Sequence, residues 1–306
     1  MTSLSQLLAT TSRTFALTIP YLPEPTCQQV KVAYLLFRIA DTFEDAVGWP
    51  RERQLEALEE FSRMLEGPDG GGAAEIAERW IREAPIDHEG YQTLLRETPF
   101  LLDRFFRLGE AIDPIRHHTR RTIEGMSGFV RRTDDDGLLR LRDLPDLRDY
   151  CYTVAGIVGE MLTDLFFLRH PELLEQESYL RERAPLFGEG LQLVNILKDW
   201  DFDLREGRSY VPSRVRRDDV FALARHDLTA AAEYTLALQS GPAERGIVAF
   251  NALPIEMAWA TLDKVEAHGS GSKISRLKVA SIVSRVERAL DRGEPVIRRA
   301  PVRPSV

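Results

Sequence analysis

The sequence predicts an all-α protein. Apolar residues recur at helical spacing along most of the chain, and no segment shows the alternation of apolar and polar residues that marks a half-buried strand. Prolines and glycines interrupt this pattern at intervals that suit helices. We therefore expect about ten or more helices and no sheet.

Helix breakers and capping residues set the expected ends of these helices. Pro25 and Pro50 each begin one, and Asp113-Pro114 has the N-cap and N1 chemistry of a third. The segment 67–72, GPDGGG, predicts a loop, and Pro254 predicts a kink. The expected helices span 25–47, 50–65, 73–84, 91–108, 113–132, 147–168, 190–204, 228–239, 242–267 and 273–292.

Two glycines inside the expected helix 147–168 predict a close contact. Gly156 and Gly159 are three residues apart, and each costs roughly 1 kcal/mol relative to alanine inside a helix. Such a cost is tolerated where another helix or a bulky ligand lies against bare backbone. We expect one of these two at this position.

Length and composition restrict the class of protein. The chain has 306 residues, of which 43% are hydrophobic and 29% charged, so a large core is expected and disorder is not. Length alone favours about two domains, but a helical protein built round one central cavity can be a single domain. We predict one domain over 1–306, with frayed ends near 1–10 and 296–306. The net charge of -8 disfavours nucleic-acid binding.

The cysteines and the N-terminus indicate a cytoplasmic protein. Cys27 and Cys151 are the only cysteines and have no metal-binding spacing, which suits a reducing compartment. The first fifteen residues lack the charge and apolar run of a signal peptide. No stretch approaches 18 uninterrupted apolar residues, so we predict no membrane-spanning segment.

The most informative stretch is the carboxylate cluster at the end of the helix 25–47. Asp41, Glu44 and Asp45 stand at i, i+3 and i+4 and therefore share one helix face. Three like charges on a helix with an apolar run ahead of them favour a bound cation. The alternative is a solvated acidic helix end.

A second polar stripe lies on the helix 190–204. Gln192, Asn195, Asp199 and Asp203 follow i, i+3, i+7 and i+11 and fall on one face of an otherwise apolar helix. We expect this stripe to be buried, which is costly unless something fills it. The alternatives are a satisfied structural network or an exposed strip.

Together the two acidic faces predict a metal site for a phosphorylated ligand. Hard carboxylate oxygens suit Mg²⁺, which keeps waters and is completed by substrate phosphates. Arg38 lies one turn before Asp41, and Arg13 and Arg208 belong to short polar motifs, so cationic groups for a diphosphate are available. Other clusters are assigned to the surface: Asp134–Asp136 as a solvated loop, and His117 and His118 as exposed residues.

Several motifs in one order resemble the squalene/phytoene synthase family of head-to-head (1'-1) isoprenoid synthases. They are SRTF at 12–15, DTFED at 41–45, YCYTVAGIVG at 150–159, NILKDWDFD at 195–203 and GRSYVP at 207–212. The resemblance covers residues 12 to about 260 and is most like squalene synthase. It implies the all-α isoprenoid-synthase fold with a central cavity.

The resemblance also implies roles for individual residues. Asp41, Glu44, Asp45, Asn195, Asp199 and Asp203 would hold Mg²⁺, with Mn²⁺ as a substitute, and Gln192 would support them. Arg38, with Arg13 and Arg208, would contact diphosphate, and Tyr150 would act in the catalytic steps. Ser12, Phe15, Tyr34, Val158 and Phe250 would complete the substrate site.

The implied reaction joins two prenyl diphosphates, and farnesyl diphosphate is our first choice, through a cyclopropyl (presqualene-type) diphosphate to squalene. In a second step the cation formed from this intermediate is reduced by NADPH, loses a proton or is captured by water. Lys273 and Arg276 are candidate contacts for NADPH, with a basic helix start on the surface as the favoured alternative. GRSYVP also resembles the carotenoid branch, so phytoene or dehydrosqualene synthase stays open, as does a synthase that stops at presqualene diphosphate or hydroxysqualene.

Two further expectations follow. We expect no C-terminal anchor, and therefore a cytoplasmic enzyme that makes transient contact with a membrane surface to release its product. The alternative from a different class is a non-catalytic helical protein that binds metal or lipid. Chain length of the substrate, final product and oligomeric state are left open.

Overall fold

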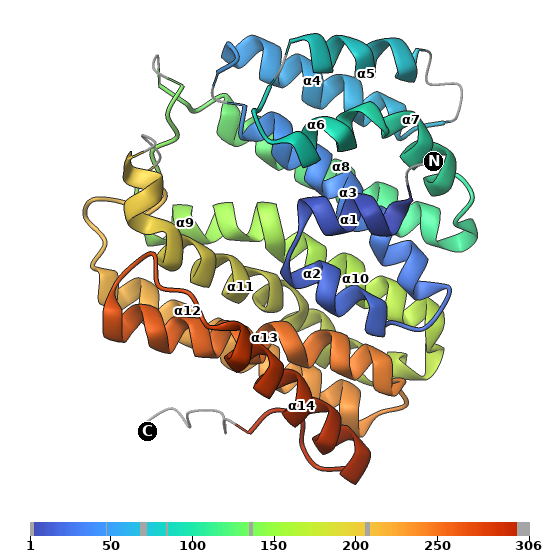
Figure 1. Ribbon diagram of the computed structural model, residues 1–306, viewed down its shortest axis with the longest axis vertical. Coiled ribbons are helices and arrows are strands. Elements are labelled where there is room, and N and C mark those ends of the chain that lie inside the picture. Colours follow the sequence, from blue (N-terminus) through green and yellow to red (C-terminus); the bar gives the residue numbers. More distant parts are fainter. Residues whose placement is uncertain are drawn as a thin grey trace. The chain divides into compact units, whose positions relative to one another are not determined.

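The computed structural model describes residues 3–46, 48–67, 72–83, 85–134, 137–205 and 209–298 (Figure 1). Over these ranges all regular structure is helical, apart from an isolated bridge between Arg140 and Ser209, which confirms the predicted all-α class. The chain divides into two compact units, 1–20 with 24–139 and 21–23 with 140–306. The prediction of a single domain stays a prediction. Of the expected frayed ends, residues 1–2 and 299–306 lie outside the described residues.

Among the described residues, the first unit holds eight α-helices. They are α1 (Leu4–Thr11), α2 (Thr14–Thr18), α3 (Thr26–Glu44), α4 (Arg51–Met64), α5 (Ala73–Arg82), α6 (Glu89–Arg96), α7 (Thr98–Phe105) and α8 (Ile112–Val130). The expected helix 91–108 is therefore two helices. Pro99 lies in the first turn of α7, where its missing N–H is tolerated, so the chain breaks just before it.

Helix α3 is the core of the first unit. Leu35, Leu36 and Ile39 are fully buried, and α1, α4, α6, α7 and α8 all pack against this helix. Phe43, near the end of α3, contacts Trp80 edge-on with ring centroids 4.6 Å apart. Burial of each such side chain contributes about 1.5–3 kcal/mol. The acidic end of α3 is thus held by its own apolar face.

Helices α4 and α8 form an antiparallel pair whose ends cap each other. Arg116 of α8 donates from Nε to the Leu65 carbonyl at the end of α4, at 2.8 Å. Arg51 at the start of α4 donates from Nη1 to the Thr133 carbonyl just beyond α8, at 3.2 Å. Each arginine therefore satisfies a carbonyl at the negative end of its partner's helix dipole.

The second unit holds the longer helices. They are α9 (Leu144–Cys151), the π-helical turn η3 (Tyr152–Gly156), α10 (Ile157–Arg169), α11 (Glu177–Arg205), α12 (Arg217–Ser240), α13 (Arg245–His268) and α14 (Arg276–Arg292), with a 3₁₀ turn at Pro171–Gln176. α11 packs against η3, α10, α12 and α13 and is the core helix of this unit.

Glycine residues allow α11 to pack closely against the segment that runs from α9 to α10. A Cβ added to Gly159 would lie 1.9 Å from the Ala184 carbonyl oxygen, and one added to Gly188 would lie 1.9 Å from that of Ala155. No side chain fits at either position, so both residues must be glycine. The predicted close approach at Gly159 is confirmed, and the neighbour is a helix.

Helix α11 is longer than the sequence predicts. It begins at Glu177, well before the expected start at 190, and it contains Pro185 and Gly188 as well as Gly190. The contacts of these glycines with neighbouring backbone outweigh a propensity cost of roughly 1 kcal/mol each. Likewise Pro254 lies inside α13, a single helix from Arg245 to His268.

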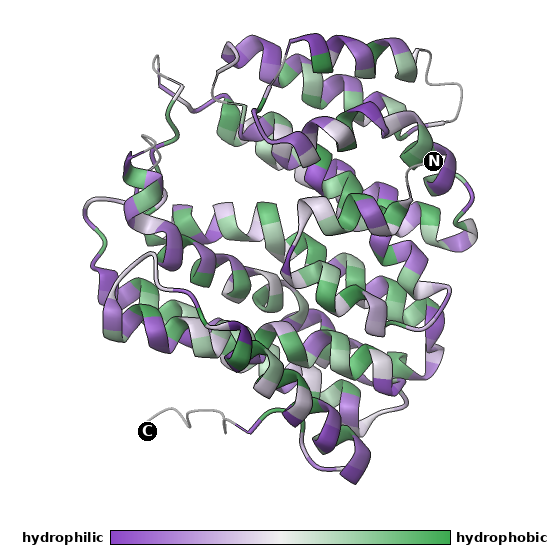
Figure 2. Ribbon diagram, viewed as in Figure 1, coloured by the Kyte–Doolittle hydropathy of each residue, from purple (hydrophilic) through white to green (hydrophobic). Residues whose placement is uncertain are grey.

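One stretch, Leu144–Arg169, is long and apolar enough by composition to cross a membrane. Figure 2 shows apolar residues along α10, and most of the stretch's most apolar window is buried inside the fold. Its burial against α11 identifies it as a core segment of the second unit.

Candidate active site

The SRTF segment is tied to α3 by a chain of contacts in the first unit. The Phe15 N–H donates to Ser12 Oγ at 3.0 Å, which shapes the turn into α2. The Phe15 ring lies 5.4 Å from that of Tyr34, and the Tyr34 hydroxyl donates to the Thr11 carbonyl at 3.1 Å. Arg13, at the N-cap of α2, is exposed. The structure thus brings Ser12, Phe15 and Tyr34 together.

Arg38 connects this aromatic group to the acidic cluster. Its Nη2 donates to the Tyr34 hydroxyl at 3.2 Å, and its Nη1 lies 3.3 Å from Asp41 Oδ2. Its Nε is buried, and no acceptor in the described part of the chain bonds it. A buried donor on a charged group is costly to leave without an acceptor. This atom indicates a place for an anion.

Electrostatics of the α3 end favour both an anion and a cation. Burial and, to a smaller extent, Asp45 raise the pKa of Asp41 to about 6, against the effect of Arg38. Burial also works against the charge of Arg38, but Asp41, Tyr34 and Tyr91 raise the pKa of the guanidinium above its usual value. Arg38 therefore stays charged, while Asp41 ionises at a higher pH than an ordinary aspartate.

The carboxylates fit the chemistry of Mg²⁺. Asp41, Glu44 and Asp45 are half-buried at the carboxyl end of α3, where the helix dipole is negative and repels further negative charge. Among the described residues no three His, Cys, Asp or Glu side chains converge as a ready metal cage. Mg²⁺ needs no such cage, because it binds through one or two carboxylates together with substrate phosphates.

The polar stripe of α11 is more exposed than the sequence suggests. Asn195 is exposed, Gln192 and Asp203 are half-buried, and 41% of the Asp199 side chain is accessible. The prediction of a buried stripe is therefore wrong. The buried apolar residues of α11 lie on the face of the helix opposite this stripe, against the neighbouring helices. Phe202 of the same helix is 58% exposed.

Lys198 already pairs with part of this stripe. Its Nζ lies 3.1 Å from Asp199 Oδ2 and donates to Asn195 Oδ1 at 3.2 Å. The amine therefore stands where a cation would neutralise Asp199. Sequence reasoning missed this residue, although its place between Asn195 and Asp199 in the NILKDWDFD motif was a signal.

Tyr150 occupies the end of α9, just before the π-helical turn. Its side chain is 3% exposed and stacks on Tyr210, with ring centroids 5.0 Å apart and the planes 26° from parallel. π-helical turns inside helices frequently mark functional sites. Tyr210, quoted in the GRSYVP motif but given no role, is therefore a second residue that sequence reasoning missed.

The remaining predicted residues are scattered over the second unit. Val158 is half-buried on α10, whereas Phe250 is fully buried on α13 and meets Phe166 edge-on at 6.5 Å. Lys273 and Arg276 are exposed at the start of α14, and the Lys273 carbonyl accepts from Lys264 Nζ at 2.7 Å. Arg208 lies outside the described residues, as does most of the Asp134–Asp136 run.

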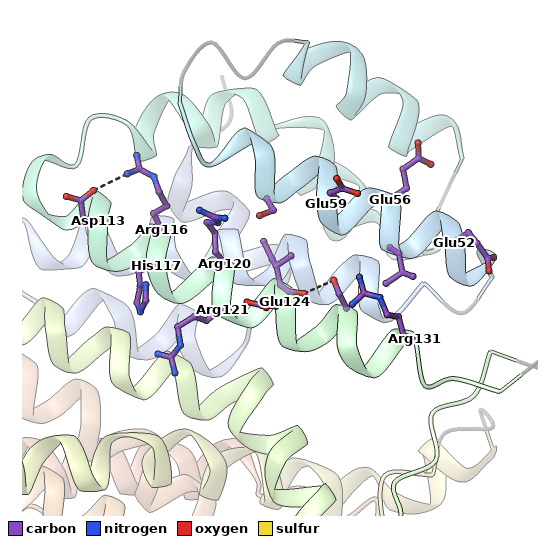
Figure 3. A pocket seen from close by; sticks show the side chains of 14 residues that line it. Glu52, Glu56, Glu59, Asp113, Arg116, His117, Arg120, Arg121, Glu124 and Arg131 are labelled. Carbon is purple, nitrogen blue, oxygen red and sulfur yellow. Dashed lines mark hydrogen bonds and ion pairs between the residues drawn. The ribbon is translucent and has the colours of Figure 1, made fainter.

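A cleft of about 980 Å³ lies between α4 and α8 (Figure 3). Acidic residues of α4 and basic residues of α8 line it: Glu52, Glu56, Glu59, Arg116, Arg120 and Arg131. None of the predicted site residues lines this cleft. His117 is exposed and lines the cleft. His118 is buried with its Nδ1 3.2 Å from Arg121 Nη1, so the surface prediction for His118 is wrong.

Comparison with known proteins identifies the class of protein. The squalene/phytoene synthase family profile matches residues 8–218, which include SRTF, DTFED, YCYTVAG and NILKDWDFD. The chain therefore belongs to this family.

Squalene synthases are among the relatives that the chain resembles. That of Schizosaccharomyces pombe is 28% identical over 214 residues, 69% of this chain and 44% of the relative. That of Eremothecium gossypii is 29% identical over 238 residues, 76% of this chain and 51% of the relative. The chain thus spans about half the length of the curated relatives it matches. A solved structure of TcSQS with a ligand is 24% identical and superimposes with a TM-score of 0.76, over 95% of this chain and 88% of that one, which shows the shared fold.

Proposed function

We propose that the protein condenses two prenyl diphosphates head to head, with farnesyl diphosphate as substrate and squalene as product. The observation that carries this proposal is the end of α3, where Arg38 holds a buried, unsatisfied Nε beside the Asp41 carboxylate. A diphosphate supplies the acceptor that Nε lacks, and a divalent cation supplies the charge that the carboxylates lack.

Two groups of acidic residues would hold metal. Asp41, Glu44 and Asp45 form one, and Asp199 and Asp203 form the other, with Asn195 and Gln192 beside them. When bound, Mg²⁺ neutralises charge that develops on the leaving diphosphate, and Mn²⁺ is expected to replace it. Lys198 must release Asp199 for this second group to act as a ligand.

The first chemical step breaks the C–O bond between one prenyl group and its diphosphate. Arg38, with Arg13 and Arg208, would bind the departing diphosphate. The double bond of the second substrate attacks the allylic cation, and loss of a proton closes the cyclopropane. We propose that Tyr150, which is buried and stacked on Tyr210, contacts the hydrocarbon part or takes part in the proton transfer.

Val158 and Phe250 would govern chain length, and Phe15 and Tyr34 would supply apolar surface beside the diphosphate. Ser12 would position Arg13 and Phe15 through the bond that it accepts from the Phe15 N–H. We propose that Lys273 and Arg276 meet the phosphates of NADPH in a second, reductive step. A cytoplasmic protein that contacts a membrane surface to release its product accords with this reaction.

The names of the relatives favour squalene as the product. Phytoene or dehydrosqualene, and the intermediates presqualene diphosphate and hydroxysqualene, are the competing products. The test is incubation with farnesyl diphosphate and Mg²⁺, with and without NADPH, followed by identification of the lipid. Squalene that forms only with NADPH supports the proposal. A 40-carbon product formed from geranylgeranyl diphosphate alone would overturn it.

A further inference from the structure

Two tyrosine rings flank the Arg38 guanidinium in the first unit. Its central carbon lies 5.6 Å from the centre of the Tyr34 ring and 5.5 Å from the centre of the Tyr91 ring. Both distances are within the range of cation–π attraction. Tyr34 lies one turn before Arg38 on α3, whereas Tyr91 comes from a different helix, α6.

The remaining contacts of Arg38 leave one donor open. Nη1 is paired with Asp41 and Nη2 with the Tyr34 hydroxyl, while the buried Nε has no acceptor among the described residues. Aromatic faces attract a guanidinium without accepting its hydrogen bonds in the plane. Tyr91 can therefore fix where the group sits and still leave Nε available to an anion.

The surroundings of Tyr91 hold the ring in place. A Cβ on the preceding residue, Gly90, would lie 2.6 Å from the Thr10 carbonyl oxygen, so only glycine lets α6 approach α1 this closely. The Tyr91 ring also lies 4.2 Å from that of His88. Burial raises the pKa of Tyr91, against the effect of Arg38, so the ring is a neutral phenol at neutral pH.

We propose that Tyr91 is a positioning residue that holds Arg38 in the orientation in which it binds diphosphate. This inference rests on the proposed function. Without the ring, the guanidinium is free to turn toward Asp41 and form a fuller ion pair, which removes the open donor and occupies a carboxylate expected to bind metal. We expect removal of the Tyr91 ring to lower the affinity for diphosphate first.

The experiment compares Tyr91→Leu with Tyr91→Phe, because phenylalanine keeps the aromatic face and leucine removes it. The probe is inorganic diphosphate, titrated by calorimetry into metal-free protein. We expect Tyr91→Leu to raise Kd about 3- to 30-fold, the range of a partly buried cation–π contact, and Tyr91→Phe to change it less than about twofold. In turnover, Tyr91→Leu should raise KM for farnesyl diphosphate more than it lowers kcat.

Tyr179→Leu is the matched control. Tyr179 makes a cation–π contact with Arg183, 3.6 Å from the ring centre, on the exposed surface of α11, and its loss should leave diphosphate affinity unchanged. Thermal melting monitors folding, and Tyr91→Met replaces Tyr91→Leu if the latter melts early.

Equal Kd values for wild type and a folded Tyr91→Leu protein would overturn the inference, as would equal losses in the Leu and Phe variants. So would a wild type that binds no inorganic diphosphate. The proposed function is judged separately, by whether wild type converts farnesyl diphosphate, so the two failures can be told apart.

Discussion

Tyr150 and Tyr210 stack on one another in the second unit, with ring centroids 5.0 Å apart and the planes 26° from parallel. Tyr150 lies in the last turn of α9, and Tyr210 follows Ser209, which makes an isolated bridge with Arg140. The stack joins two segments about sixty residues apart in sequence and restricts the orientation of the Tyr150 ring.

Replacing Tyr210 with leucine should therefore lower turnover. We expect a drop in kcat of about tenfold, because a stacked aromatic pair contributes about 0.5–1.5 kcal/mol beyond burial. Tyr210→Phe, which keeps the stack, should retain more than half of the activity. The measurement is steady-state release of diphosphate from farnesyl diphosphate. Equal losses in both variants would assign the effect to the Tyr210 hydroxyl instead.

Asp41→Asn should nearly abolish turnover. The substitution removes the charge that a divalent cation needs while keeping the shape of the side chain, and we expect a loss of about 10²–10³-fold in kcat. Glu59→Gln, on the exposed face of α4, is the control for loss of one negative charge and should behave as wild type. Unchanged diphosphate release by Asp41→Asn would show that the α3 cluster has no part in the reaction.

Glu189 should make stability depend on pH. It is buried on α11, and burial together with Asp227 raises its pKa to about 7, against the effect of Arg148. Because the folded-state pKa exceeds the unfolded value of about 4.3, stability is lost as pH rises from about 4.3 through 7 and is constant above that.

Glu189→Gln should remove this loss. The free energy of unfolding of Glu189→Gln should equal that of wild type near pH 4. It should exceed the wild-type value increasingly toward pH 7, and by roughly 2–3 kcal/mol above pH 8. Urea denaturation across this range measures it. Glu182→Gln, exposed on the same helix, should show no such trend. A constant difference between Glu189→Gln and wild type at every pH would contradict the assignment.

Gly159→Ala should unfold or strongly destabilise the second unit. The new methyl group would meet the Ala184 carbonyl at 1.9 Å, so α10 and α11 must separate, at an expected cost of about 2–4 kcal/mol. Gly128→Ala is the matched control, since its Cβ would meet nothing within 4 Å on α8 and should stabilise that helix by up to about 1 kcal/mol. A Gly159→Ala protein as stable as wild type would mean that the two helices are not in contact.

The extent of sequence-based prediction differs between fold and site. Helical periodicity is a local property, so the all-α class and most helices were predictable. Helix ends were not: α11 begins at Glu177 rather than near 190 and contains Pro185, and the expected helix 91–108 is two helices, α6 and α7. Tertiary contacts override such weak local preferences, as Gly188 illustrates by lying against the Ala155 carbonyl.

For the candidate site, the sequence by itself determined which residue types share a helix face. Asp41, Glu44 and Asp45 lie together at the end of α3, and Asp199 and Asp203 lie on one stripe of α11, because helical spacing requires it. Motif order was enough to indicate the family. Local spacing carries no information on burial, which is why the α11 stripe was expected to be covered and is not.

Only the tertiary structure decided what surrounds each charged group. It placed Tyr91 of α6 on Arg38, Tyr210 on Tyr150 and the Lys198 amine on Asp199. It also left Arg38 Nε buried without an acceptor among the described residues. Tyr91 and Tyr210 reach their partners from segments distant along the chain, where no sequence period applies. Their positions follow from how whole helices pack, and that depends on every residue of the core.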